Sequence, residues 1–520
     1  MTPPSDLIAR YLPGRPFVKE GNALIIPTTD KEIADTVSAL LKASLPCISM
    51  FATDERERDG TFRIKYVFGI PGESYFLVPF ISVRESFSSL AHIFPGLALY
   101  EREIMTLFGL IPRGHPDPRT LTLHEENWPA GTYPLRKDFA GNTLVPETHT
   151  GDYEFKKVSG EGIYEIPVGP VHAGIIEPGH FRFSVLGEEI VSFEPRFGWV
   201  HKGTEKLFEG APLARAVSLA EHVSGDSAFS HALAFCQAIE ALTGAVVPPR
   251  AQYLRLVFAE LERLTMHIFD IGNIAGNGTG FSFMAAQGFR IVENLRRLSF
   301  ELAGHRFLRE VAVPGGITKD SRPDSIATLT RFLKELRKDF GEMVRVAHSS
   351  ASLVNRLKGT GEVPRSVVLD YGGTGIAARA CGLAKDARVE YPYAAYDTIV
   401  PNLCLTENGD VDARFQLRIK EVFESIRLIE EALRTLPEGP THTSLPNLPE
   451  TGLGIAIVEG WRGEIVYAVK IEDGALSRVK VRDPSFIHWQ LFAHLGSKDM
   501  VPDFPLINKS FNLSYTGNDL

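Results

Sequence analysis

The chain has 520 residues, 44% hydrophobic and 23% charged, which is enough for two or three domains with their own cores. Its formal net charge of −9 provides no basic footprint, so nucleic acid is not an expected partner. The four cysteines form no CxxC pair, which excludes a self-contained zinc ribbon or ferredoxin-type cluster. No apolar stretch reaches the roughly 18 residues that span a bilayer. Any membrane contact is therefore expected through partners or a docking face.

Residues 1 to about 140 alternate between strand-like and helical patterns, as in an α/β domain. The predicted elements are Ala23–Pro27 (strand), Asp30–Leu45 (helix), Arg63–Ile70 and Ser74–Ile81 (strands), and Glu85–Leu90 and Tyr100–Leu107 (helices). No glycine-rich phosphate loop accompanies them, so no dinucleotide-binding motif is visible. The polar stretch Ala140–Asp152 indicates a linker. We therefore predict a domain at 1–145, a linker at 146–160 and a second domain at 161–520.

The second part is mainly helical, with strands at its start and near its end. Helical spacing of apolar residues predicts helices at Tyr253–Ile268, Arg290–Leu302, Asp324–Leu357 and Ala413–Leu436. Strands are predicted at Tyr164–Val168, Phe181–Phe193 (with a turn at Gly187-Glu188), Ile455–Val458, Ile465–Ile471 and Ser477–Val481. The expected fold class is α+β.

Short motifs follow one another in the first domain between residues 100 and 139. They are Tyr100-Glu101-Arg102-Glu103, Leu107-Phe108-Gly109, Gly114-His115-Pro116-Asp117, and Tyr133-Pro134-Leu135-Arg136-Lys137-Asp138-Phe139. This ordered series resembles the C-type subunit of respiratory complex I. Its basic side chains would suit ion-paired docking onto a neighbouring subunit, or would form a solvated charged rim: Arg102, Arg113, Arg119, Arg136 and Lys137.

A second series of motifs runs from residue 169 towards the C-terminus. It includes Gly169-Pro170-Val171-His172-Ala173-Gly174, His201-Lys202-Gly203-Thr204-Glu205-Lys206, Glu260-Leu261-Glu262-Arg263 and Trp461-Arg462-Gly463-Glu464. The series is similar to the large subunit of group 4 membrane-bound nickel–iron hydrogenases, of the hydrogenase-4 and formate hydrogenlyase type, and to the homologous D-type subunit of complex I.

This resemblance implies a subunit of an energy-converting oxidoreductase complex, peripheral at the cytoplasmic face of the inner membrane. Its implied partners are an iron–sulfur small subunit, whose cluster would supply electrons, and antiporter-like and other membrane subunits. No cofactor is predicted to be bound by this chain, with a quinone as the one exception that the resemblance allows. No nicotinamide site is visible in the sequence. The name NADH dehydrogenase would therefore describe the whole complex rather than this chain.

The resemblance also locates four positions where the hydrogenases hold their metals with cysteines. Here these positions are Ser224, Ser227, Ser485 and His488. Nickel and low-valent iron need soft, anionic thiolates, whereas a serine hydroxyl is a hard ligand that seldom deprotonates. We therefore expect no nickel–iron centre and no hydrogenase activity.

In complex I the corresponding cavity is similar to a quinone headgroup site. His172 matches the family's quinone-contacting histidine on a β-hairpin, although it could equally stabilise a turn. The family's quinone-contacting tyrosine has no counterpart in the segment 218–225. This departure argues against classical quinone reduction and favours a subunit that binds no redox ligand.

Four more residues match functional positions of the family. Glu205 matches a proton-relay glutamate, which would work if burial raises its pKa, or it is a helix N-terminal carboxylate. His267 matches a histidine near the partner's terminal cluster, or it is a core histidine. Arg379 and Asp397 match charged positions facing the old metal cavity, where a mutual or networked ion pair is the plainer interpretation.

Two alternatives to an electron-transferring subunit stay open. One is a catalytically silent scaffold that assembles partners. The other is an enzyme with a non-nickel metal, for which His222 and Asp226 would lie on one helical face and converge with His231 and His488.

Overall fold

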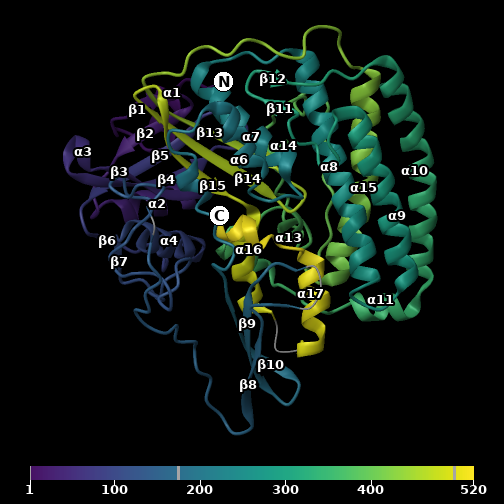
Figure 1. The fold of residues 1–520 in the computed structure, drawn as a ribbon, viewed down its shortest axis with the longest axis horizontal. Helices are drawn as coiled ribbons and strands as arrows, with labels where there is room; N and C mark the ends of the chain where they lie inside the picture. The colour runs from purple at the N-terminus through teal and green to yellow at the C-terminus, as the bar shows by residue number, and fades with distance from the viewer. Residues whose placement is uncertain (1, 144, 173–175, 496–498) are drawn as a thin grey trace.

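The protein is described by a computed structural model covering residues 2–143, 145–172, 176–495 and 499–520. Figure 1 shows a mixed part, which contains the N-terminal sheet, beside a bundle of long helices formed by later segments. The expected α+β class is confirmed. A three-stranded sheet from near the C-terminus lies between the two parts (Figure 1).

The N-terminal sheet has five strands in the order β1-β2-β5-β4-β3. They are β1 (Val18–Glu20), β2 (Ala23–Pro27), β3 (Cys47–Glu55), β4 (Thr61–Gly69) and β5 (Phe76–Val83). Only β2 and β5 pair in parallel. Apolar side chains of α1 (Pro4–Tyr11), α2 (Ile33–Lys42) and α4 (Ala98–Phe108) cover one face of this sheet. Most predicted elements are therefore present; α3 (Arg56–Asp59) and η1 (Pro95–Leu97) are short additions.

The helix predicted at Glu85–Leu90 is wrong. The segment contains a short strand, β6 (Ser86–Ser88), which pairs in parallel with β7 (Ile111–Arg113). Phe87 is the one fully buried side chain of β6 and anchors it in the N-terminal core. Its one buried residue lies between two half-buried serines, which is the alternation of a strand. A pattern of three residues is too short to be distinguished from helical spacing in the sequence.

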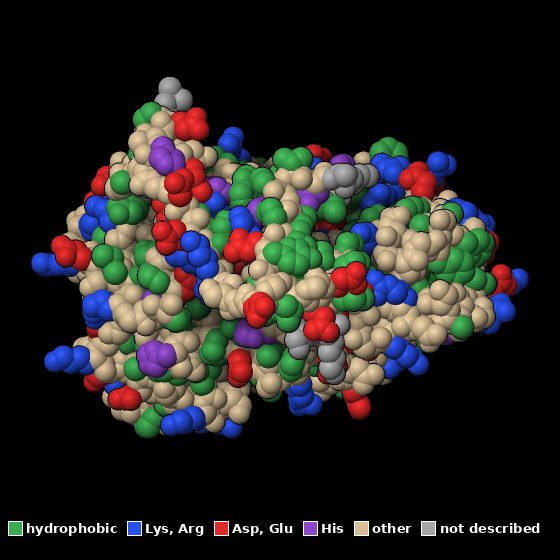
Figure 2. Space-filling view, turned by 90° about the horizontal axis from the view of Figure 1, so that it is seen from below, with side chains coloured by type: hydrophobic (Ala, Val, Ile, Leu, Met, Phe, Trp, Pro, Cys, Tyr) green, Lys and Arg blue, Asp and Glu red, His purple; other side chains and the backbone are tan. Residues whose placement is uncertain are grey.

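A second small sheet, β10-β9-β8, extends away from both parts at the bottom of Figure 1. Its strands are β8 (Ile163–Val168), β9 (His180–Leu186) and β10 (Glu189–Arg196), and Gly187 has the positive φ expected at the turn. The motif that begins at Gly169 enters the loop between β8 and β9, where Ala173 and Gly174 lie outside the described residues. Figure 2 views the molecule from below and shows apolar side chains gathered near the middle of that face.

The bundle is built on two long helices, α8 (Pro249–Ala275) and α15 (Val411–Arg434), that pack along each other. Around them lie α6 (Leu213–Glu221), α7 (Ala228–Thr243), α9 (Ser282–Ala303), α10 (Pro323–Ser349), α11 (Ala351–Leu357), α12 (Arg365–Asp370), α13 (Gly375–Arg379) and α14 (Ala387–Glu390). The helix predicted at Asp324–Leu357 is two helices, because Ser350 is extended and its side chain caps α11. No helix in the described ranges combines the length and apolarity needed to cross a bilayer.

The remaining elements are short except for the central sheet. They are β11 (Ala312–Val313), β12 (Gly316–Ile317), β13 (Thr451–Glu459), β14 (Glu464–Glu472), β15 (Ala475–Arg482), α5 (Thr204–Leu207), α16 (Pro484–Leu491), η2 (Phe492–His494), η3 (Val501–Asp503), α17 (Phe504–Phe511) and α18 (Tyr515–Asp519). The sheet β13-β14-β15 packs on α7 and, on its other side, on the second face of the N-terminal sheet.

This apolar contact between the two sheets, which we call the seam, joins the first domain to the second. It contains Ile25, Ile48, Phe51, Val67 and Val78 from the first domain and Leu453, Ile455, Ile457, Val466 and Ala468 from the second. Asn22 extends it, because its side-chain N–H donates to Ile455 O (2.8 Å) and its side-chain carbonyl accepts from Ile455 N (2.9 Å).

The basic side chains between residues 102 and 137 form contacts within the chain itself. Lys137 donates to Ser477 O (2.5 Å) and Arg119 pairs with Glu194 (2.6 Å).

Candidate functional site

Charged side chains, rather than apolar ones, fill part of the contact between α8 and α15. On α8 they recur three or four residues apart, hence on one helical face: Glu260, Arg263, His267 and Asp270. The facing residues of α15 are Arg418, Glu421 and Ser425. All seven are buried. Because a buried charge is tolerated only when it is paired and hydrogen-bonded, this contact can exist only as a connected network.

His267 lies in the middle of that network. Its Nε2 donates to Glu421 (2.8 Å), and its Nδ1 accepts from Arg418 (3.2 Å). Burial lowers the pKa of His267 to about 4, so the ring is neutral at pH 7 with its proton on Nε2. Within the described residues, His267 is therefore a hydrogen-bonded core histidine.

Arg379 is fully buried and bonds three carboxylates. It donates to Glu421 (2.9 Å) and Glu459 (2.7 Å), and it lies 3.4 Å from Asp386. The networked ion pair expected for Arg379 is present. The mutual pair with Asp397 is not, because Asp397 is exposed on the surface and its contact is with Thr398 Oγ1 (3.2 Å). Sequence reasoning missed Glu421 and Glu459 as the partners.

The serines at the predicted cysteine positions come together in space. Ser224 Oγ donates to Ser514 Oγ (2.9 Å), and Ser485 Oγ accepts from Ser514 N (2.9 Å). Ser227 lies on the same loop as Ser224, between α6 and α7, and all four serines are buried. Two segments about 260 residues apart in the chain thus meet around one small region.

Arg462 and Asp226 form an ion pair at this meeting point. The guanidinium donates to both carboxylate oxygens of Asp226, at 2.8 and 2.7 Å, and lies 3.5 Å from Ser224 Oγ and 3.4 Å from Ser227 Oγ. Burial raises the pKa of Asp226, but Arg462 outweighs burial and holds it below its usual range. Ser224 and Ser227 therefore lie beside a fixed cation supplied by the chain itself. A metal ion could not share this position without displacing Arg462.

The histidine and aspartate cluster proposed as a non-nickel metal site is wrong in its geometry. His222 and Asp226 lie in the loop between α6 and α7, not on one helical face. His231 donates from Nε2 to Asp483 (3.1 Å), and His488 Nε2 accepts from Thr374 N (3.1 Å). Across the residues that the structure describes, no group of three or more His, Cys, Asp or Glu side chains could hold a metal ion.

Glu205 is buried at the start of α5, beneath β15. Its carboxylate pairs with Arg478 (2.7 Å) and Lys480 (3.3 Å) and accepts from Val481 N (2.9 Å). Burial alone would raise the pKa of Glu205, but the two cations outweigh it and the net shift is downward. The raised pKa expected for a relay is instead found for Glu103 of the first domain. Burial raises the pKa of Glu103, although Lys480 also donates to its carboxylate (2.6 Å).

His172 lies, half-buried, in the loop that follows β8. Its Nε2 donates to Gly179 O (2.7 Å), and its ring lies 5.6 Å from that of Phe181. Phe181 in turn packs on Tyr515, the neighbour of Ser514 (ring centroids 6.3 Å apart). His172 thus borders the serine region through two aromatic rings, with one nitrogen engaged by the backbone.

The chain is similar to known protein families along most of its length. Residues 27–144 match the family described as "Respiratory-chain NADH dehydrogenase, 30 Kd subunit", and residues 278–451 and 446–519 match its "49 Kd subunit". Formate hydrogenlyase subunit 5 of Escherichia coli is 31% identical over 90% of this chain and 84% of the relative. The chain belongs to this complex I and hydrogenase large-subunit family.

Two further relatives extend the family assignment. The C/D subunit of the NADH-quinone oxidoreductase of Bacteroides thetaiotaomicron is 29% identical over 76% of this chain and 78% of the relative. A chain of the membrane-bound sulfane sulfur reductase, an archaeal respiratory membrane complex, superposes with a TM-score of 0.65 at 25% identity. That superposition covers 69% of this chain and 99% of the solved one. The relatives of this chain thus include a formate hydrogenlyase subunit, a subunit of an NADH-quinone oxidoreductase and a chain of a sulfane sulfur reductase.

Proposed function

We propose that this chain is the large subunit of a membrane-associated, energy-converting oxidoreductase complex that does not use a nickel–iron centre. Electrons would come from a cluster on an iron–sulfur partner subunit and pass to a quinone or another acceptor. The chain would sit peripherally at the cytoplasmic face of the membrane, against antiporter-like membrane subunits. The relatives, which are named as subunits of respiratory or hydrogenlyase complexes, support this assembly.

One observation carries the exclusion of nickel–iron chemistry from this proposal. Arg462 is held by Asp226 beside Ser224 and Ser227, and Ser224 in turn contacts Ser514, which contacts Ser485. The donor set is thus hard hydroxyl oxygens around a guanidinium, whereas nickel and low-valent iron require thiolates. The residues present do not fit that metal centre, so no step of the proposed function passes through it.

The proposal assigns proton coupling to the buried cluster of Glu205, Lys480 and Glu103. A lysine shared by two carboxylates, at 2.6 and 3.3 Å, allows one added proton to be accommodated by a small rearrangement of the ammonium. Glu103 is the member that burial predisposes to carry a proton, and Glu205 the member that stays ionised. This arrangement would link both domains to any charge movement in the complex.

The first experiment is affinity purification of the tagged chain from its native host in gentle detergent, with partners identified by mass spectrometry. We expect an iron–sulfur subunit and membrane subunits to co-purify, and nickel measured by inductively coupled plasma mass spectrometry to stay at background. Recovery of the full-length chain alone at normal expression would contradict the proposed assembly. Stoichiometric nickel would contradict the exclusion of a nickel–iron centre.

A silent scaffold is the second candidate, and one observation favours it. Glu205 and His172 are both engaged in internal bonds that stabilise the fold without any ligand. The variant Glu205→Gln, in a complex shown to be fully assembled, separates the two ideas. A fall in turnover with a shifted pH profile supports proton coupling, whereas turnover equal to that of the exposed control Asp397→Asn supports the scaffold.

A further inference from the structure

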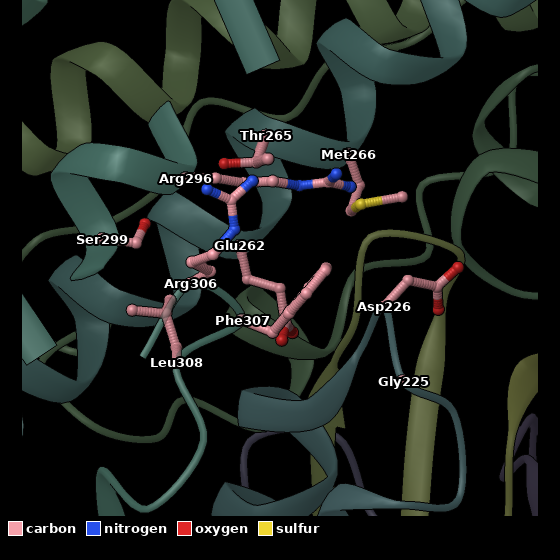
Figure 3. A pocket seen from close by; sticks show the side chains of 10 residues that line it. All are labelled: Gly225, Asp226, Glu262, Thr265, Met266, Arg296, Ser299, Arg306, Phe307 and Leu308. Atoms are coloured by element: carbon pink, nitrogen blue, oxygen red, sulfur yellow. The ribbon is translucent and has the colours of Figure 1, made fainter. Parts of the chain in front are cut away.

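A pocket lies beside Asp226, between α8, α9 and the segment 306–308 (Figure 3). Arg296 of α9 and Arg306 both line it, and Figure 3 shows their side chains close together above Phe307. The Arg296 guanidinium lies over the Phe307 ring, 4.9 Å from its centroid. The pocket is distinct from the serine region, because Asp226 forms the wall between them and turns its carboxylate towards Arg462.

The acidic groups of this pocket are already neutralised by other parts of the chain. Asp226 is bonded through both oxygens to Arg462. Glu262 accepts from Phe229 N (2.8 Å) and Ser230 N (3.1 Å) at the start of α7. Neither carboxylate is hydrogen-bonded to Arg296 or Arg306 among the described residues. Arg296 therefore has no hydrogen-bonded carboxylate partner in the described part of the chain, although Asp226 and Glu293 lie near enough to act on its charge.

The arginines, in contrast, are short of acceptors. The Nε of Arg296 is buried without a hydrogen-bond partner in the described part of the chain. Arg306 pairs with Glu293 (2.6 Å), but that carboxylate is shared with Arg297 (2.8 Å). Burial lowers the pKa of Arg296, and the positive charge of Arg306 lowers it further. A buried donor with no acceptor and a neighbouring like charge are both costly, and an anion between them would relieve both costs.

We infer that this pocket is a binding site for a small molecule that carries an oxyanion group, with Arg296 and Arg306 as its donors. Carboxylate, phosphate and sulfate each present two oxygens on one central atom, and a guanidinium recognises such a pair through two parallel N–H donors. The Phe307 ring supplies an apolar floor for the rest of the ligand. The site goes beyond the proposed function and stands whether or not the chain transfers electrons.

The test measures binding of inorganic phosphate and, separately, of acetate to the full chain by isothermal titration calorimetry, at constant ionic strength with chloride as the replaced ion. We expect at least one of the two to bind the wild-type chain. The variant Arg296→Met should weaken that binding about 10-fold or more, because it removes charge-assisted donors. The matched control is Arg290→Met, the same change on α9 at an exposed side chain that pairs with Asp339 (2.6 Å) and does not line the pocket, and it should change affinity less than about twofold.

A second measurement needs no variant and therefore does not depend on folding of Arg296→Met. Phenylglyoxal modification of the wild-type chain is followed residue by residue by mass spectrometry, with and without the anion that binds. Protection of Arg296 and Arg306, but not of Arg297, is the expected result. Three outcomes would overturn the inference: no binding of either anion, equal weakening by Arg296→Met and Arg290→Met, or no selective protection. The last two would indicate adventitious surface electrostatics.

Discussion

Substituting Arg379 by methionine tests whether the buried charge network holds the α8–α15 contact together. The change removes the donors to Glu421 (2.9 Å) and Glu459 (2.7 Å) and leaves two carboxylates buried without that cation. Removing one partner of a buried pair costs about 3–5 kcal/mol. Burial already raises the pKa of Glu459 to about 7 against the opposing charge of Arg379, so Glu459 should bind a proton still more readily without that cation.

The assay is urea unfolding followed by circular dichroism, with the free energy of unfolding obtained by linear extrapolation. The control is Arg337→Met, the same chemical change at the exposed Arg337–Glu430 pair (2.7 Å), which should cost at most about 1 kcal/mol. The loss for Arg379→Met should be smaller at pH 5 than at pH 8, because the orphaned carboxylates accept protons more readily at pH 5. Adding Glu459→Gln should recover part of it. A loss no larger than that of the control, or one independent of pH, would refute this reasoning.

Three other predictions concern the seam, the serine region and the pocket. Asn22→Ala should destabilise the chain by about 1–3 kcal/mol in urea unfolding, because it leaves the N–H and carbonyl of Ile455 without their partners; no loss would mean that water replaces the amide. Ser224→Cys combined with Ser227→Cys should leave nickel and iron at background by mass spectrometry, since Arg462 and Asp226 still fill the centre, and recovered metal would contradict that assignment. Burial raises the pKa of Glu262 to about 7, so its stabilising contribution is complete below about pH 4.5 and is lost as pH rises through 7. Glu262→Gln should therefore flatten the dependence of unfolding free energy on pH in that window, and an unchanged slope would disprove the shift.

The long helices and many strands could be predicted from the sequence because their apolar residues recur with one period. Strand β2 spans the predicted Ala23–Pro27, α8 and α9 each contain a predicted helix, and α15 covers all but the last two residues of another. Strand β3 (Cys47–Glu55) was missed, since all nine of its residues are buried and so lack a polar face; the N-terminal core covers one side and the seam the other.

The partners within the site were harder to predict than its location. Family resemblance brought Ser224, Ser227 and Ser485 to one place, and the hydrogen bonds through Ser514 are consistent with it. The roles of Glu421 and Arg418 were missed, because charged residues on a helix usually indicate a solvent-exposed face. A signal was present: charges on α8 and on α15 recur every three or four residues, as matching stripes inside helices that otherwise have apolar faces. Pairing across 150 residues of chain cannot be read from spacing alone.

The seam between the two sheets has a consequence for assembly. In a fused polypeptide the first domain is always present at one copy per second domain, and its local concentration is set by the tether, on the order of millimolar. Docking of the two sheets is then a folding step rather than a bimolecular encounter, so it needs no excess of either part. A weakened seam would consequently open and reclose instead of losing a component, and dilution during purification would not separate the domains.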